Sequence, residues 1–433
     1  MLHDVRDPGE LATAEAEQLE SSGYEIGDLL DRARVAADSS DLEVLAGITA
    51  ELDGAPSSAD WKYEEPDDEA AIFALASALP TLRVDEVELE TRVTGAWLGR
   101  CVGNTMGKPV EGLSADVIRT YLEAAGAWPQ TGYIPLISPL PAGVSHLHPS
   151  ADVATEGNFT DVPRDDDIDW AILGLFMVEK WGAALTTDDI AETWLDRIPF
   201  TQTYTAERAA YRNLVRGLPS SVAATVENPY REWIGALIRA DIFGYVHPGR
   251  LDRAVKSAYV DARLSHVKNG LYGETWAAAL VSASFSTDSA RVALEAAQAS
   301  LPHQSRMAEA LQAVLDLDAS GADVDTAYAW VDAKLGHYHW VHAINNAALI
   351  AIGLLWGTDF RTTLAITIAG GRDTDSNGAT VGSVYGALHG VEGIPEDLVG
   401  TTHVVVRSSV RDFDRITIAE LAARTLRQIE ALA

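Results

Sequence analysis

The stretch Gly370-Gly-Arg-Asp-Thr-Asp-Ser-Asn-Gly-Ala-Thr-Val-Gly-Ser-Val-Tyr-Gly-Ala-Leu-His-Gly390 joins an acidic turn to a glycine-rich helical segment. Asp373 and Asp375 stand two residues apart in the turn, followed by Ser376 and Asn377. Carboxylate, hydroxyl and amide oxygens are the ligands that hard cations such as Mg²⁺ prefer. The turn is therefore a candidate metal site.

Glycine recurs every fourth residue in two segments, at Gly378, Gly382, Gly386 and Gly390 in one and at Gly95, Gly99, Gly103 and Gly107 in the other. A spacing of four places these residues along one face of a helix. Because glycine in a helix interior costs about 1 kcal/mol relative to alanine, such a row indicates the close approach of a second helix. We therefore expect the two segments to pack face to face, which would bring Glu111, just beyond the second row, to the acidic turn.

A second acidic group, Asp-Asp-Asp at 165–167, comes directly before the apolar helical run 170–178. An EF-hand is excluded for the first acidic turn, because its twelfth position is Val384, where a calcium loop needs a bidentate glutamate. Helix capping explains one carboxylate at a helix start. It does not explain carboxylates from three separate stretches, which favour metal binding.

The rest of the chain predicts an all-α protein. From about residue 86 onward, alanine, leucine and isoleucine recur with a period near 3.6, and alternating strand patterns are scarce. Helices are predicted at 170–185, 188–196, 205–217, 231–242, 249–264, 271–286, 288–300, 304–319, 322–334, 338–357, 359–369 and 377–389. We expect a compact multi-helix bundle at 86–433, preceded at 1–85 by an N-terminal helical extension and connector.

Residues 128–164 interrupt the helical pattern. They contain six prolines and show little periodicity. A stretch of that length without structure of its own is usually a functional loop or lid. Since it ends directly at Asp165, we expect it to lie close to the acidic groups.

The composition excludes several classes of protein. The net charge of −32, from 64 acidic and 32 basic residues, argues against nucleic acid or an anionic membrane as the main partner. The single cysteine, Cys101, allows no intrachain disulfide and lies in an apolar helical setting, which favours a packing role over a nucleophile. No apolar signal segment or run of about 18 apolar residues occurs, so we expect a cytoplasmic protein.

Several histidines invite a catalytic or metal interpretation. His337, His339 and His342 are spaced so that only the last two would share a helical face, and no cysteine supports them, which favours a substrate pocket, together with Asn345 and Asn346, over zinc. For His266 a structural role and a substrate role are equally open. The chain lacks the P-loop, Gly-x-Ser-x-Gly and His-Glu-x-x-His motifs, which excludes P-loop NTPases, α/β-hydrolases and zincins.

Three motifs resemble, in this order, those of the ADP-ribosylglycohydrolase family, which includes dinitrogenase-reductase-activating glycohydrolase: Gly99-x3-Gly103-x3-Gly107-x-Pro109-Val-Glu111-Gly112, Asp165-Asp-Asp-Ile-Asp-Trp170 and Gly370-Gly-Arg-Asp373-Thr-Asp375-Ser-Asn-Gly378. The resemblance covers roughly residues 90–400. It implies an all-α orthogonal bundle and two Mg²⁺ ions, for which Mn²⁺ can substitute, between a Thr-Asp-Asp and an Asp-x-Asp-Thr motif. It also implies hydrolysis of an N- or O-glycosidic bond at the anomeric carbon of a ribose.

Site residues follow from the resemblance by position. The implied metal ligands are Asp165, Asp166, Asp167, Asp373, Asp375 and Ser376, with Asp165 and Ser376 standing where the family has threonine. Glu111 resembles the family's mobile glutamate and would act as a gate or as the general base, so Glu111, Asp166 and Asp375 are the expected catalytic residues. The side chains expected at the substrate are Asn158, Arg231, His266, Tyr272, His339, His342, Asn345 and Arg372.

The sequence does not identify which ribosyl compound is the substrate. The Gly/Ser-rich loop that binds pyrophosphate in ADP-ribose-cleaving members is not found, and the middle of the chain reads Asn228-Pro-Tyr-Arg231-Glu-Trp and Ser265-His-Val-Lys-Asn-Gly-Leu-Tyr272 instead. We expect a Mg²⁺-dependent glycohydrolase acting on an ADP-ribosylated substrate, either a small molecule or protein-linked. An N-ribosyl hydrolase of a smaller nucleoside- or nucleotide-like metabolite and a non-catalytic ribosyl-binding protein are the alternatives.

Overall fold

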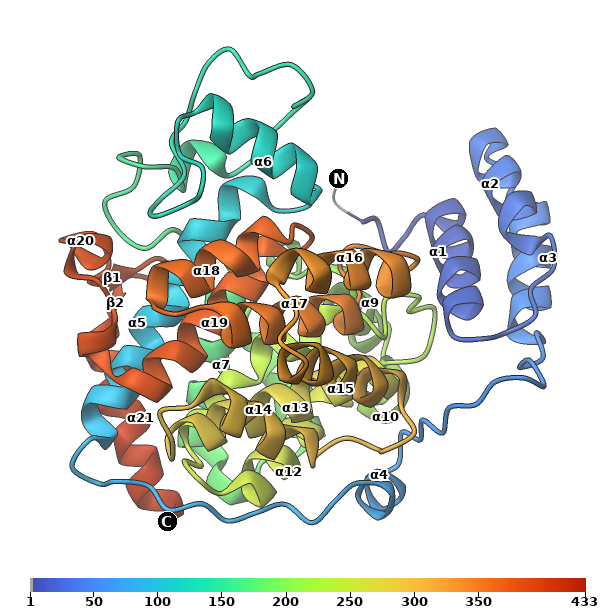
Figure 1. Ribbon diagram of the computed structural model, residues 1–433. Helices are drawn as coiled ribbons and strands as arrows, with labels where there is room; N and C mark the ends of the chain where they lie inside the picture. Colours follow the sequence, from blue (N-terminus) through green and yellow to red (C-terminus); the bar gives the residue numbers. More distant parts are fainter. Residues whose placement is uncertain (1–2) are drawn as a thin grey trace.

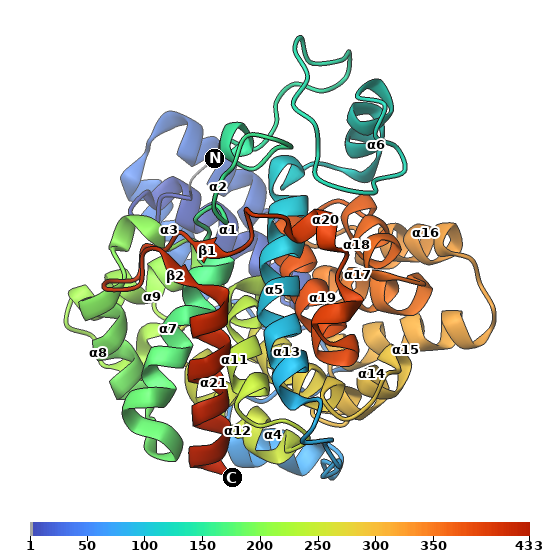
Figure 2. The same ribbon diagram turned by 90° about the vertical axis from the view of Figure 1, so that its left-hand side faces the viewer.

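Two helices that lie against each other along their glycine faces form the centre of the fold. α5 (Leu89–Gly107) and α19 (Thr374–His389) run antiparallel and lie side by side in Figure 2. Their backbones touch, since a Cβ built on Gly99 would lie 2.0 Å from the carbonyl oxygen of Gly382. The packing predicted from the four-residue spacing is therefore confirmed.

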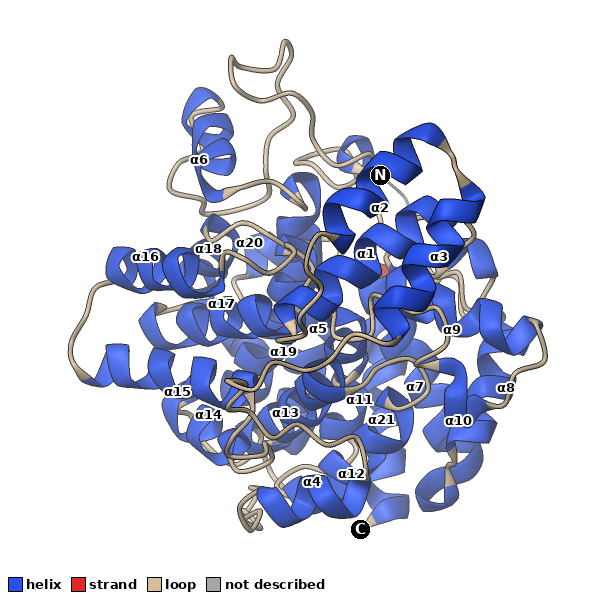
Figure 3. Cartoon of the chain, turned by 90° about the vertical axis from the view of Figure 1, so that its right-hand side faces the viewer, coloured by secondary structure: helices blue, strands red, loops and turns tan. Residues whose placement is uncertain are grey.

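The protein is described over residues 3–433 by a computed structural model, whose other helices surround this pair (Figures 1 and 3). Over these residues it has 21 α-helices and one two-stranded antiparallel sheet, which confirms the all-α prediction. The remaining elements are α1 Pro8–Ser21, α2 Leu29–Ser39, α3 Leu42–Asp53, α4 Glu69–Leu75, α6 Ala115–Ala124, α7 Asp166–Trp181, α8 Thr187–Arg197, α9 Thr205–Val215, α10 Ser220–Ala223, α11 Asp241–Tyr245, α12 Leu251–Ala262, α13 Lys268–Ser284, α14 Ala290–Gln298, α15 Arg306–Ala319, α16 Val324–Leu335, α17 Ala343–Trp356, α18 Phe360–Ala369, α20 Glu396–Val399, β1 Val405–Val406, β2 Ile416–Thr417 and α21 Ile418–Leu432. None of the helices in this described part is both long and apolar enough to cross a membrane.

The core lies around the central pair. α13, α17 and α18 contact α19, and α21 contacts α5. Residues 269–284 of α13 and 343–354 of α17 are buried without interruption, as is typical of helices that are apolar on all sides. This packing holds the C-terminal end of α5 and the N-terminal end of α19 in fixed positions.

The helices predicted at 231–242 and 338–357 differ most from the structure. Residues 231–242 form a 3₁₀ helix, η5 (Ile234–Arg239), followed by α11, because the first amide of η5 donates to the carbonyl of Val341 in another segment. The helix predicted at 338–357 begins only at α17, and His342 is its N-cap, with Nδ1 accepting from the amide two residues on. His339 and His342 therefore do not share a helical face.

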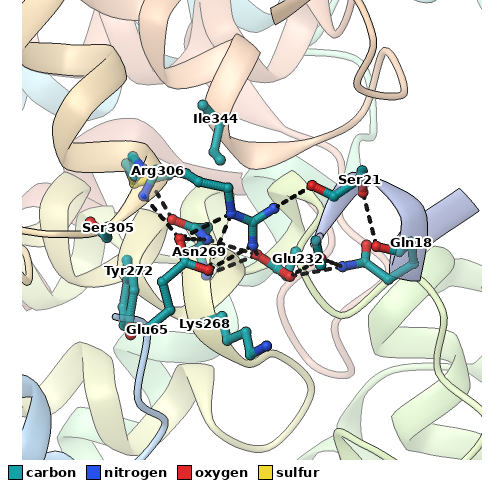
Figure 4. Close-up of polar contacts among 12 residues, drawn as sticks. Gln18, Ser21, Glu65, Glu232, Lys268, Asn269, Tyr272, Ser305, Arg306 and Ile344 are labelled. Carbon is teal, nitrogen blue, oxygen red and sulfur yellow. Dashed lines mark hydrogen bonds and ion pairs between the residues drawn. The ribbon is translucent and has the colours of Figure 1, made fainter. Parts of the chain in front are cut away.

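The three N-terminal helices have an apolar cluster of their own and join the body through a buried polar network. Arg306 of α15 donates to Glu65 in the connector and to Glu232, and Gln18 of α1 also donates to Glu232, at 2.8 Å (Figure 4). Burial alone would raise the pKa of Glu232, but Arg306 and the other donors hold that pKa well below its usual value. The N-terminal segment is thus tied to the core by charge as well as by apolar contact.

Replacing Arg306 with methionine is expected to lower the free energy of unfolding by about 3 kcal/mol, because it leaves two buried carboxylates without their cation. The Glu65 and Glu232 side chains are 3% and 1% exposed. Arg119→Met is the control, since Arg119 is 61% exposed in its pair with Glu123 and should cost less than about 1 kcal/mol. Urea unfolding of both variants measures the difference, and equal losses would contradict a stabilising role for the network.

Candidate metal and active site

Five carboxylates from three parts of the chain converge where α5 ends and where α7 and α19 begin. They form two groups, Glu111 with Asp373 and Asp375, and Asp165 with Asp167 and Asp375. Within each group the oxygens lie within 4.8 Å of one another, and Asp375 belongs to both. All but Glu111 are buried. The carboxylate of Asp166 stands outside both groups.

Backbone contacts between the ends of α5 and α19 set this geometry. Thr374 Oγ1 donates to the carbonyl of Gly107 at 2.8 Å, and a Cβ on Gly107 would lie 2.1 Å from the carbonyl oxygen of Thr374. The amide of Gly112 donates to the carbonyl of Arg372 at 2.9 Å, and the amide of Arg372 donates to Leu113 at 3.1 Å. Arg372 adopts φ +68°, a conformation unfavourable for a residue with a Cβ. The Glu111 turn is therefore fastened to the Asp373 turn.

α7 is oriented toward the same point. Asp165 caps this helix by accepting from the amide of Asp167 at 3.1 Å, and a helix N-terminus favours negative charge. Asn104 of α5 donates to Asp167 Oδ2 at 3.2 Å, and Ser376 Oγ lies 3.4 Å from the same oxygen. Both glycine-rich helices thus contribute a side chain that positions Asp167.

Lys108 and His148 are members of the site that sequence reasoning missed. Lys108 Nζ lies 2.7 Å from Glu111 Oε2, 2.8 Å from Asp165 Oδ2 and 2.6 Å from Asp375 Oδ2. His148 Nε2 lies 3.3 Å from Glu111 Oε2. The lysine directly follows the last glycine of the α5 row, which is the signal that points to it. The histidine belongs to the 128–164 segment, so that long loop does reach the site, as expected.

Asn346 of α17 is a further residue that holds the acidic turn. Its Oδ1 accepts from Asn377 Nδ2 at 2.8 Å and from the amide of Asp373 at 3.3 Å. Its Nδ2 donates to the carbonyl of Trp340 at 2.8 Å. The adjacent Asn345 donates to the carbonyl of His339 at 3.0 Å. The sequence predicts both asparagines at the substrate, and that role stays a prediction.

The site carries more negative charge than its surroundings balance. Burial, with neighbouring carboxylates, raises the pKa of Glu111 to about 8 and that of Asp166 to about 7. Asp167 and Asp373 have pKa values well above the usual range for the same reasons. The pKa of Asp165 is lowered instead, because the charge of Lys108 and the hydrogen bonds from Asp167 and Lys108 outweigh its burial. Such a cluster fits a bound divalent cation.

Two oxygens of the cluster lack a hydrogen-bond donor among the described residues. They are Asp167 Oδ1 and Asp375 Oδ1, and both side chains are 2% exposed. A buried carboxylate oxygen without a partner is costly unless something outside the protein satisfies it. These residues therefore fit a metal ion. Because their ligand atoms are carboxylate oxygens, the ion is expected to be a hard cation that prefers oxygen ligands.

Arg372 lines a cavity of about 310 Å³ beside the acidic turns. The cavity is also bounded by Gly112, Tyr338 and Trp340. The guanidinium of Arg372 pairs with Asp332 of α16 at 2.8 Å. Of the residues predicted at the substrate, Arg372 is the one that the structure places on this cavity.

The other residues predicted at the substrate contact other parts of the protein. Arg231 makes a two-pronged ion pair with Glu15 of α1, at 2.6 and 2.8 Å. Tyr272 donates to the carbonyl of Pro66 in the connector. His339 stacks on Trp233 with ring centroids 4.2 Å apart. The contacts of Arg231 and Tyr272 join the N-terminal segment and the connector to the body, whereas the His339 stack lies within the body. A role of these three residues at the substrate stays a prediction.

The last three have local partners. His266 Nδ1 lies 2.8 Å from Ser265 Oγ, and burial holds its pKa well below the usual value. His342 caps α17 and stacks on Tyr338, with centroids 4.3 Å apart. Asn158 is exposed and donates to Thr155 at 2.9 Å. Their assignment to the substrate likewise stays a prediction.

Comparison with known proteins shows which family the chain belongs to. No curated protein matches the chain significantly. The chain is similar in fold to a solved structure titled "ADP-ribosylglycohydrolase-related protein complex", with 19% identity and a TM-score of 0.48, over 80% of this chain and 100% of that one. The family model described as ADP-ribosylglycohydrolase matches residues 85–431. This protein, with its acidic residues at the starts of α7 and α19, therefore belongs to the ADP-ribosylglycohydrolase family.

Proposed function

We propose that the protein is a Mg²⁺-dependent glycohydrolase, with Mn²⁺ as a substitute ion, that cleaves the bond at the ribosyl anomeric carbon of an ADP-ribosylated substrate. The observation that carries this proposal is the convergence of five carboxylates, two of which have a buried oxygen without a donor among residues 3–433. A bound cation would hold ribose hydroxyls and polarise the attacking water. Residues 86–433 form the catalytic part and residues 1–85 an extension.

The residues of the chain have distinct roles in this proposal. Glu111 takes the proton of the attacking water, because its pKa is raised and it is the least buried carboxylate of the two groups. Lys108 and His148 fix the direction of its carboxylate. Asp373, Asp375 and their neighbours supply an anionic surround that stabilises the oxocarbenium-like transition state of glycosidic cleavage.

A smaller ribosyl substrate is the second candidate, and the cavity beside the site favours it. Arg372 is the one basic residue lining that cavity, and it already pairs with Asp332. A pyrophosphate is normally bound by free arginine or lysine groups or by a glycine-rich turn. Trp340, a partly exposed residue of the same lining, offers an aromatic ring to a nucleobase instead.

A substrate panel tests both candidates. Purified protein with Mg²⁺ is offered ADP-ribosyl-arginine, ADP-ribosyl-serine and free nucleosides, with and without EDTA, and release of the ribosyl product is followed by chromatography. Cation-dependent release from the ADP-ribosyl compounds supports the first candidate, and release from nucleosides alone supports the second. Binding without turnover of any compound would make the protein a ribosyl-binding protein.

Cation affinity is expected to rise with pH between about pH 5 and about pH 8, by about tenfold per pH unit for each proton released. The reason is that the raised pKa values of Asp166, about 7, and of Glu111, about 8, leave carboxylates around the site partly protonated near neutral pH, and a cation bound nearby favours their ionised forms. Below this range the carboxylates are protonated and the affinity falls. Calorimetric titration with Mg²⁺ in two buffers of different ionisation enthalpy counts the protons, and a pH-independent affinity would contradict the expectation.

A further inference from the structure

Lys108 occupies a position within the carboxylate cluster that resembles that of a metal ion. Its ammonium group lies within 2.8 Å of an oxygen from each of Glu111, Asp165 and Asp375, which come from three separate segments. The side chain is 11% exposed. Convergence of several carboxylates from different segments on one point is how proteins bind a divalent cation, and here an ammonium group stands at that point.

A second position in the same cluster has carboxylate oxygens without a donor among residues 3–433. Asp375 accepts from Lys108 through Oδ2, whereas its Oδ1 has no donor within the described residues. Asp167 Oδ1 is likewise without a donor, while its Oδ2 accepts from Asn104 and Ser376. Both side chains are buried, so these two oxygens favour a cation beside them.

We propose that the ammonium group of Lys108 permanently takes the place of one of the two cations, so that the chain binds a single divalent ion, held by Asp167 and Asp375. The inference rests on the proposed cation-dependent function and departs from the two ions that the family resemblance implies. An ion next to the ammonium would be repelled by it, and the oxygens such an ion needs are already engaged.

The charge balance of the cluster supports the replacement of one cation by the Lys108 ammonium group. Asp165 stands at the position of a neutral threonine in the family motif, which adds one negative charge, and Lys108 pairs with it at 2.8 Å. The lysine thus offsets the charge of the added aspartate and also keeps Glu111 in place at 2.7 Å. With its ammonium group built in, the site keeps part of its geometry before any ion binds.

Metal stoichiometry of the full chain tests the inference. Wild-type protein is titrated with Mn²⁺, and bound and free ions are counted by electron paramagnetic resonance. We expect one Mn²⁺ per wild-type chain and two per Lys108→Met chain, with spin coupling between the two ions in the variant. Lys62→Met is the matched control, because Lys62 is 64% exposed and pairs with Glu309 on the surface, and it should bind one ion. Lys108→Gln serves as a second variant if the methionine variant does not fold.

The outcomes separate this inference from the proposed function. Two ions on the wild-type chain, or one ion on folded Lys108 variants, would overturn the inference and leave a cation-dependent hydrolase. No ion on wild-type or variant chains, with circular dichroism showing native helix content, would overturn both. A single anomalous peak in a crystal of the Mn²⁺-loaded wild-type protein, next to Asp167, would support the inference independently.

Discussion

Asp375→Asn is expected to lower kcat/KM for ribosyl hydrolysis by about 10³-fold or more, the loss that follows removal of one preorganised electrostatic group at a reacting centre. Asp375 is the carboxylate shared by both groups of the site, and its side chain is 2% exposed. One of its oxygens accepts from Lys108, and the other has no donor in the part of the chain that the structure describes. Asparagine keeps the shape of the side chain but removes the charge, so both the cation and the anionic surround are weakened.

The measurement is initial-rate hydrolysis with Mg²⁺, together with circular dichroism and a Mg²⁺ titration. The matched control is Asp397→Asn, because Asp397 lies near the start of helix α20, is 73% exposed and pairs with Arg361. The control should keep full activity and cation affinity. Undiminished turnover by Asp375→Asn would refute the assignment of the site, whatever its effect on stability.

Gly99→Ala is expected to lower the free energy of unfolding by about 4 kcal/mol or more, a size reserved for severe changes in packing. The added Cβ would lie 2.0 Å from the carbonyl oxygen of Gly382, and backbone cannot turn aside as a side chain can. Alanine is the better helix former by about 1 kcal/mol, so propensity and packing predict opposite signs. The steric contact with Gly382 is expected to outweigh the gain in helix propensity.

Gly47→Ala is the control for this substitution. Gly47 lies inside α3, and apart from the backbone of its own helix and its chain neighbours no heavy atom of the described residues lies within 4 Å of a Cβ built on it. There the propensity term should act alone and stabilise the protein by up to about 1 kcal/mol. Urea unfolding of both variants shows the contrast, and a Gly99→Ala protein as stable as the wild type would mean that α5 and α19 are not packed backbone to backbone.

The sequence by itself predicted those features that depend on the spacing of residues close together in the chain. Glycine at every fourth residue predicted that α5 and α19 pack together, because a helix turns once in about 3.6 residues and places such residues on one face. Acidic residues directly before apolar runs marked the starts of α7 and α19. The absence of periodicity at 128–164 marked the loop that contributes His148 to the site.

Only the tertiary structure decided which side chains face those carboxylates. Lys108 is one residue beyond the glycine row, and its pairing with Asp165 and Asp375 joins positions far apart in the chain. Arg231 and Tyr272 have residue types suited to a substrate, yet contact the N-terminal segment and connector. A helical period states which face a residue lies on, whereas the partner on that face depends on long-range packing, which no local pattern of residues encodes.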